Sequence, residues 1–130
     1  MSKVFFRLDN IVEGPTPDEL AAMFPELAGS ELDRKMQSVW ATDPCINTFE
    51  VLAAVVNTPP ENGFGESEIQ MVVSISERLK DAEPNESRFF TPDEWNYILK
   101  RLKAFRWRVA HQRVLNLISR VALAPKVEGE

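Results

Sequence analysis

The chain has 130 residues, of which 44% are hydrophobic and 27% charged, and its formal net charge is −5. This length fits one domain with a core of its own, and the composition excludes a disordered or fibrous protein. A single cysteine, Cys45, excludes an internal disulfide and is typical of a reducing compartment. The longest apolar stretch, residues 49–56, is far shorter than the roughly 20 residues that cross a bilayer. We therefore expect a cytoplasmic protein without a membrane partner.

Residues 1–14 are expected to form an N-terminal arm. Val4, Phe6 and Leu8 fall at every second position, which is the pattern of a strand with one apolar face. Because an isolated two-stranded hairpin is marginally stable, the arm must lie on the core or pair with another chain. It either packs as an extended segment or turns back at residues 9–10 into a short hairpin.

Two helix starts are marked by the same tetrapeptide, Thr16-Pro17-Asp18-Glu19 and Thr91-Pro92-Asp93-Glu94. In each, threonine can cap the helix, proline suits the first helical position, and glutamate can close a capping box. In the second copy, Phe90 and Trp95 occupy the two positions of a hydrophobic staple. Since the segments share nothing else, they indicate two separate helix starts and not an internal repeat.

Residues 15–90 are expected to form an acidic helical body. The helices predicted here cover residues 17–24, residues 31–41, a stretch from 43–44 or 47 to 57, and a stretch from 67 to about 82. The third of these is apolar nearly all round, which is typical of a central, enclosed helix. The fourth is predicted to be capped by Ser67.

Residues 91–124 are expected to form one long basic helix, followed by a frayed tail at residues 125–130. An apolar stripe begins at Trp95, and beyond Ala110 it moves round the helix by roughly 100°. A regular helix drifts by only about 20° per heptad, which is too little to explain the shift. Either this helix bends or breaks near residues 110–112, or its two halves bury against different things. The predicted fold is an all-α single domain of about five helices, with an extended or short β arm.

The two parts of the chain carry opposite charges. Residues 1–90 hold seven basic and sixteen acidic side chains, whereas residues 91–130 have a net charge of +4. Residues 95–124 contain seven Lys or Arg and no Asp or Glu. We therefore expect something acidic to meet this helix, whether the body of the same chain, another protein or a nucleic acid.

Arg106, Arg113 and Arg120 are seven residues apart and so lie along one line of a helix. In one interpretation, their stems cover the edge of the core and their guanidinium groups pair with acids of the body. The candidate acids are Glu68, Glu77, Asp81, Glu83 and Glu86. In two others, the basic residues bind a partner protein or nucleic-acid phosphates. The acidic body and a pI near 5 disfavour nucleic acid.

Two aromatic residues have both a binding and a packing interpretation. Trp107 lies between Arg106 and Arg108 and outside the first apolar stripe, as a binding hot spot would. In the packing interpretation it joins the second apolar face, or Lys103 covers it in a cation–π pair. Phe64 lies between two glycines, where it is either an exposed contact point on a loop or a side chain folded back onto the core.

The residue types needed for catalysis or metal binding do not assemble into a pattern. There is one histidine and one cysteine, so no zinc-type spacing occurs. Cys45 and His111 could formally make a catalytic Cys–His dyad, but each is a lone residue in the sequence. Residues 63–65 lack the glycine pattern and the lysine of a phosphate-binding loop. We expect no catalytic residue, no metal and no cofactor.

The function predicted from these observations is that of a non-enzymatic protein–protein interaction factor. It would be a small adaptor, assembly, chaperone-like or regulatory protein of the kind encoded by phages and mobile elements, and a homo-oligomer. The predicted partner-binding residues are Lys100, Arg101, Lys103, Arg106, Trp107, Arg108, Arg113, Arg120 and Phe64. The alternative is a nucleic-acid-binding regulator whose phosphate contacts come from Lys100, Arg101, Lys103, Arg108 and His111.

Overall fold

A computed structural model describes residues 3–107 and 110–129. Its elements are β1 (Lys3–Asp9), β2 (Val12–Glu13), α1 (Pro17–Met23), α2 (Gly29–Trp40), β3 (Ile46–Asn47), α3 (Thr48–Asn57), α4 (Glu66–Leu79), β4 (Ser87–Phe90), α5 (Pro92–Ala104), α6 (Gln112–Ala122) and β5 (Lys126–Gly129). The strands form an antiparallel sheet in the order β4-β1-β5 and a β2-β3 pair. The predicted all-α fold, a purely helical bundle, is therefore wrong, and the fold is mixed α/β.

The central strand of the larger sheet is β1, which explains the error. The strand pattern in residues 4–8 is confirmed, but β1 pairs with β4 through Phe6 and Phe90 and with β5 through Phe5 and Val127. Both partners lie far away in the sequence, and β1 does not pair in the short hairpin at residues 9–10 that was one of the two alternatives for the arm. Residues 126–129, expected to fray, instead form β5.

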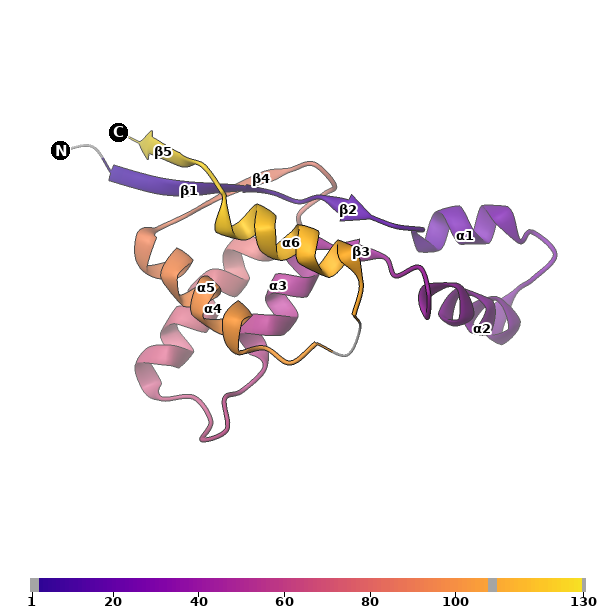
Figure 1. Cartoon of the computed structure of the whole chain (residues 1–130), viewed down its shortest axis with the longest axis horizontal. Helices are drawn as coiled ribbons and strands as arrows, with labels where there is room; N and C mark the ends of the chain where they lie inside the picture. Colours follow the sequence, from indigo (N-terminus) through magenta and orange to yellow (C-terminus); the bar gives the residue numbers. More distant parts are fainter. Residues whose placement is uncertain (1–2, 108–109, 130) are drawn as a thin grey trace.

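The core lies between the larger sheet and helices α3 to α6 (Figure 1). As predicted, α3 is central: Leu52, Val55 and Val56 are at most 1% exposed. Asn10 is also fully buried, and its side chain joins three segments. Its amide nitrogen donates to the carbonyls of residues 82 and 83, and its side-chain oxygen accepts from the backbone N–H of Phe49.

The helix starts follow the caps that the sequence indicates. Thr16 and Thr91 each accept a hydrogen bond from the backbone N–H three residues on, and Asn47 caps α3 in the same way. The rings of Phe90 and Trp95 lie 5.6 Å apart, which confirms the staple contact. Ser67 does not cap α4, because this helix begins one residue before it and Gly65 stands at the cap.

The long C-terminal helix is broken, which was one of the two predicted outcomes. Helix α5 ends at Ala104 and α6 begins at Gln112, so the break lies at residues 105–111. The buried face of α5 contains Trp95, Ile98 and Leu102, and that of α6 contains Val114, Leu117 and Val121. The displaced apolar stripe is thus explained by two helices that bury separate faces in one core.

Helices α1 and α2 form a helical hairpin that projects from the rest of the molecule (Figure 1). We call the chain that joins it to the body, residues 13–16 and 41–45, the stalk. Within the hairpin, only Leu20 of α1 is fully buried, and α2 has no buried residue. Among the described residues, no helix is both long and apolar enough to span a membrane.

Candidate protein-binding surface

The outer face of α5 carries the basic residues that do not take part in packing. Helical periodicity places Ile98 and Leu102 in the core and leaves Lys100 and Lys103 exposed. Arg106, just after the helix, is also exposed. Arg101 is half-buried, and its guanidinium donates a 2.8 Å hydrogen bond to the carbonyl oxygen of Thr58.

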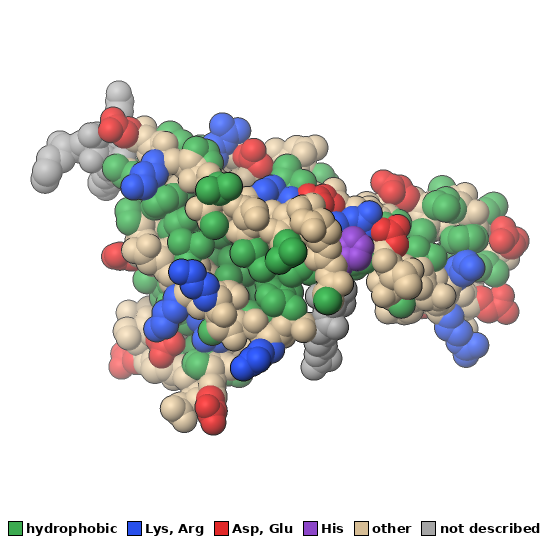
Figure 2. Space-filling model, viewed as in Figure 1, with side chains coloured by type: hydrophobic (Ala, Val, Ile, Leu, Met, Phe, Trp, Pro, Cys, Tyr) green, Lys and Arg blue, Asp and Glu red, His purple; other side chains and the backbone are tan. Residues whose placement is uncertain are grey.

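An apolar groove runs along the junction of α5 and α6, and we call it the α5–α6 groove. It consists of two hollows of about 430 Å³ and 280 Å³ that share Trp107 and Ile118. The first is also lined by Ala110, His111, Gln112, Val114 and Leu115, and the second by Leu99, Leu102, Lys103, Phe105 and Ala122. Figure 2 shows apolar side chains gathered over these helices, with Lys and Arg side chains beside them.

Trp107 lies between the two hollows and is held in place by its neighbours. Its ring meets that of Phe105 edge-on at 4.8 Å, and it packs against the core while remaining half-buried. Leu115 of α6 is 57% exposed beside it. The rigid indole and the exposed leucine together form an apolar surface whose burial against a partner is favourable.

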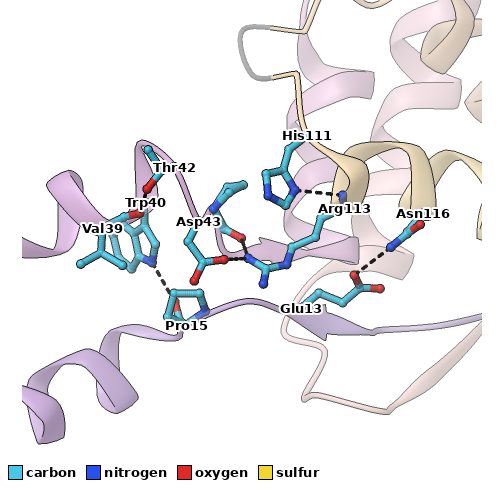
Figure 3. A network of polar contacts seen from close by, with 10 residues as sticks. Glu13, Pro15, Val39, Trp40, Thr42, Asp43, His111, Arg113 and Asn116 are labelled. Carbon is cyan, nitrogen blue, oxygen red and sulfur yellow. Dashed lines mark hydrogen bonds and ion pairs between the residues drawn. The ribbon is translucent and has the colours of Figure 1, made fainter.

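Of the three arginines spaced seven residues apart, only Arg113 and Arg120 share a helix, α6, and both have partners within the chain. Arg113 pairs with Asp43 and donates to the carbonyl oxygen of Pro44 at 2.8 Å (Figure 3). Arg120 pairs with Glu13 and donates to the Thr48 hydroxyl at 3.0 Å.

The acids that meet these arginines are not among the five candidates read from the sequence. Both Glu13 and Asp43 belong to the stalk, whereas the candidates lie within or just after α4. The basic charge of α6 is thus matched internally, and Lys100, Lys103 and Arg106 on the α5 side remain exposed without an ion pair in the described chain.

The stalk is held closely against α6. Figure 3 shows Arg113 reaching Asp43, while the Trp40 indole N–H donates to the Pro15 carbonyl oxygen at 2.7 Å. Gly14 has φ +101°, and a Cβ atom there would clash with the Pro44 carbonyl oxygen and approach the Arg113 guanidinium. Only glycine tolerates both constraints.

The remaining predicted residues lie away from the groove or are already bonded. Phe64 is half-buried and packs against the core, so it takes the second of its two interpretations. Arg108 lies outside the described residues. His111 uses its Nδ1 atom to accept a hydrogen bond from the Arg113 backbone N–H at 3.1 Å.

The pKa values of Cys45 and Glu94 are shifted in opposite directions. Burial, together with nearby Glu50 and Glu19, raises the pKa of the Cys45 thiol, which disfavours the nucleophilic thiolate. Burial also acts to raise the pKa of Glu94, but hydrogen bonds from Ser74, Arg78 and the Thr91 backbone outweigh it and hold that pKa below its ordinary value. Within the described residues, no three His, Cys, Asp or Glu side chains are grouped to hold a metal ion.

Sequence reasoning also missed that the helices of residues 17–40 project from the body as a helical hairpin. A signal was present, because residues 17–40 carry five carboxylates against two cations and only a thin apolar stripe.

Comparison of the chain with protein-family models, with curated proteins and with solved structures gives no match.

Proposed function

We propose that this protein is a non-enzymatic protein–protein interaction factor, a small adaptor, assembly or regulatory protein of the cytoplasm. The observation that carries the proposal is the α5–α6 groove, which is lined by Trp107, exposed Leu115 and Lys103. Arg106, exposed next to Trp107 in the sequence, adds a second cation near it. The free, half-buried Cys45 suits a reducing compartment.

Such a groove suits a protein ligand of particular chemistry. Tryptophan and arginine are enriched among the residues that dominate binding energy, and apolar hollows receive the anchoring side chains of a partner. The exposed cations at one side favour carboxylates and steer their approach. The matching ligand is a segment that presents an apolar side chain flanked by acidic ones.

A nucleic-acid ligand has less support from the geometry. Of the five residues considered for phosphate contacts, Arg101 is bonded to a carbonyl and His111 accepts a backbone hydrogen bond with Nδ1. Lys100 and Lys103 remain exposed, next to a body whose first 90 residues carry a net charge of −9. Binding to a polyanion would have to overcome that repulsion.

The test is a capture experiment on nuclease-treated extract with matched variants. Leu115→Glu introduces a charge into the groove, and Val73→Glu on α4 is its control because Val73 is 55% exposed and lies outside the groove. Lys103→Glu with Arg106→Glu reverses the basic side, and Lys80→Glu with Lys126→Glu changes the net charge equally. We expect proteins captured by the wild type to be lost with both groove variants and retained with both controls.

Two results would count against the proposal. If the groove variants retain all the captured proteins, the α5–α6 groove is not the binding surface. If the purified protein binds DNA or RNA with a steep loss of affinity in salt, and the groove variants abolish that binding, the nucleic-acid alternative replaces it.

A further inference from the structure

We propose that the α5–α6 groove binds the helical hairpin of a second copy of this chain. This inference rests on the proposed function, since it names the partner of the same surface. Four properties of the described residues support it: the incomplete packing of the hairpin, its charge, its apolar tip and the rigidity of its stalk.

The helical hairpin lacks packing partners within its own chain. Helices α1 and α2 contact each other, and neither makes an extensive contact with another described helix or strand. Leu32, Met36 and Val39 of α2 are only half-buried, although they form its apolar stripe. Two short helices cannot enclose a core, so this element gains stability by docking on another surface.

The hairpin and the groove carry opposite charges. The five carboxylates of residues 17–40 are all exposed, and they are Asp18, Glu19, Glu26, Glu31 and Asp33. None of them forms an ion pair in the described chain. The same is true of Lys103, which lines the groove, and of Arg106, which precedes Trp107 in the sequence. In Figure 2 both acidic and basic side chains lie toward the far end of the hairpin, and its five carboxylates outnumber its two cations, Arg34 and Lys35. Unpaired charges of opposite sign favour contact between the hairpin of one copy and the groove of another. They disfavour contact between two hairpins or between two grooves.

The tip of the hairpin has the apolar anchor that the groove requires. Met23, at the end of α1, is 66% exposed, and Glu26 and Glu31 follow in the connection and in the first turn of α2. Methionine is unbranched and adapts to irregular hollows. The two hollows beside Trp107, of about 430 Å³ and 280 Å³, are large enough to take such a side chain.

The rigid stalk prevents a hairpin from filling the groove of its own chain. The Arg113–Asp43 ion pair and the hydrogen bond from Trp40 to Pro15 fix the direction in which the hairpin leaves the body. In that direction the tip points away from α5 and α6 (Figure 1). The contact is therefore between copies and joins two different surfaces, so repetition produces a closed ring or an open chain.

The test measures the mass of purified full-length protein by light scattering at chain concentrations up to about 500 μM. The average mass of the wild type is expected to exceed the 14.8 kDa of one chain, and to fall toward that value at high salt. Lys103→Glu/Arg106→Glu in the groove and Glu26→Lys/Glu31→Lys in the hairpin should each weaken association about tenfold. Met23→Ser, at an exposed position that leaves the charge unchanged, should also weaken it.

Mixing the two charge-reversed variants provides the decisive arm. Each variant alone brings like charges together, whereas in the mixture every hairpin finds a groove of opposite sign. We expect the mixture of the two charge-reversed variants to regain the mass of the wild type. As a control, Lys80→Glu/Lys126→Glu is mixed with the hairpin variant. This mixture should show only the association that Lys80→Glu/Lys126→Glu has by itself. Circular dichroism of each variant checks that the helices are retained.

The inference is overturned if the wild type stays monomeric over the whole concentration range, or if the mixture fails to regain mass. It is also overturned if both charge-reversed variants associate as the wild type does. A monomeric wild type whose groove variants still lose captured proteins would reject self-association and leave the proposed function standing.

Discussion

Arg113 of α6 pairs with Asp43 of the stalk, so that the C-terminal part of the chain fixes the position of the N-terminal helical hairpin. The same guanidinium donates to the Pro44 carbonyl oxygen, and its side chain is 25% exposed. The Trp40 indole N–H donates to the Pro15 carbonyl oxygen in the other segment of the stalk, residues 13–16. Both chain segments that lead to the hairpin are therefore held by polar contacts. This arrangement makes the hairpin a rigid projection and not a loosely tethered one.

Replacing Arg113 by Ala should loosen the stalk more than it lowers global stability. The pair is partly exposed, so we expect a loss of about 1 kcal/mol in the free energy of unfolding. Amide hydrogen exchange at Ala41, Thr42 and Asp43, whose N–H groups are bonded to carbonyls of α2, should accelerate at the same time. Arg106→Ala is the control, since that exposed side chain forms no described ion pair. Unchanged exchange in the stalk would contradict the role given to Arg113.

Gly14→Ala should be among the more damaging substitutions in the chain. A Cβ atom at this position meets the Pro44 carbonyl oxygen and the Arg113 guanidinium, in a conformation with φ +101°. We expect a loss of more than about 2 kcal/mol, measured by urea unfolding. Gly29→Ala provides the control, because Gly29 also has positive φ but open space around it, and it should cost about 1 kcal/mol. Equal losses at the two sites would show that the close approach at Gly14 does not matter.

Glu94→Gln should lower stability at neutral pH and have little effect in acid. The folded-state pKa of Glu94 lies below its ordinary value of 4.5, because hydrogen bonds from Ser74, Arg78 and Thr91 outweigh burial. Its ionised form therefore stabilises the fold fully above the ordinary pKa, and this contribution is lost as pH falls through the folded pKa. Urea unfolding of both proteins at pH 7 and pH 3 measures the difference. A gap that widens in acid, or one matched by Asp93→Asn, would contradict this assignment.

Cys45 should react slowly with a thiol reagent in the folded protein. Burial, with Glu50 and Glu19 nearby, raises its pKa and lowers the thiolate fraction at neutral pH. We expect the rate of modification at pH 8 to be lower in buffer than in urea, and to rise with pH above 9. A folded-state rate that equals or exceeds the rate in urea would show a reactive thiol instead.

The sequence predicted those parts of the fold that depend on local chemistry. Thr16, Asn47 and Thr91 cap helices because their side-chain oxygens satisfy a backbone N–H three residues away. The break between α5 and α6 was visible because the apolar stripe changes face. The sheet was missed because β4 and β5 are four residues each and pair with β1 across long helical stretches of the chain, and no local pattern specifies such a pairing.

The candidate site was predictable only in part. Lys100 and Lys103 are exposed because helix periodicity puts them opposite Ile98 and Leu102. The internal partners of Arg113 and Arg120 were not predictable, since Asp43 and Glu13 reach α6 only when the stalk folds beside it. The groove itself is lined by residues of both α5 and α6, and which of them meet depends on tertiary packing.

The most direct test of the docking surface is photo-crosslinking from position 115. Leu115 is replaced by a photoreactive phenylalanine analogue, and Val73 is replaced in the same way as a control of matched exposure. On irradiation of the purified protein and of cell extract, we expect crosslinked protein from position 115 and little from position 73. In the purified sample, position 115 should be crosslinked to peptides from residues 17–40 of another copy. Equal or absent crosslinking at both positions would contradict the account that the α5–α6 groove binds a protein partner.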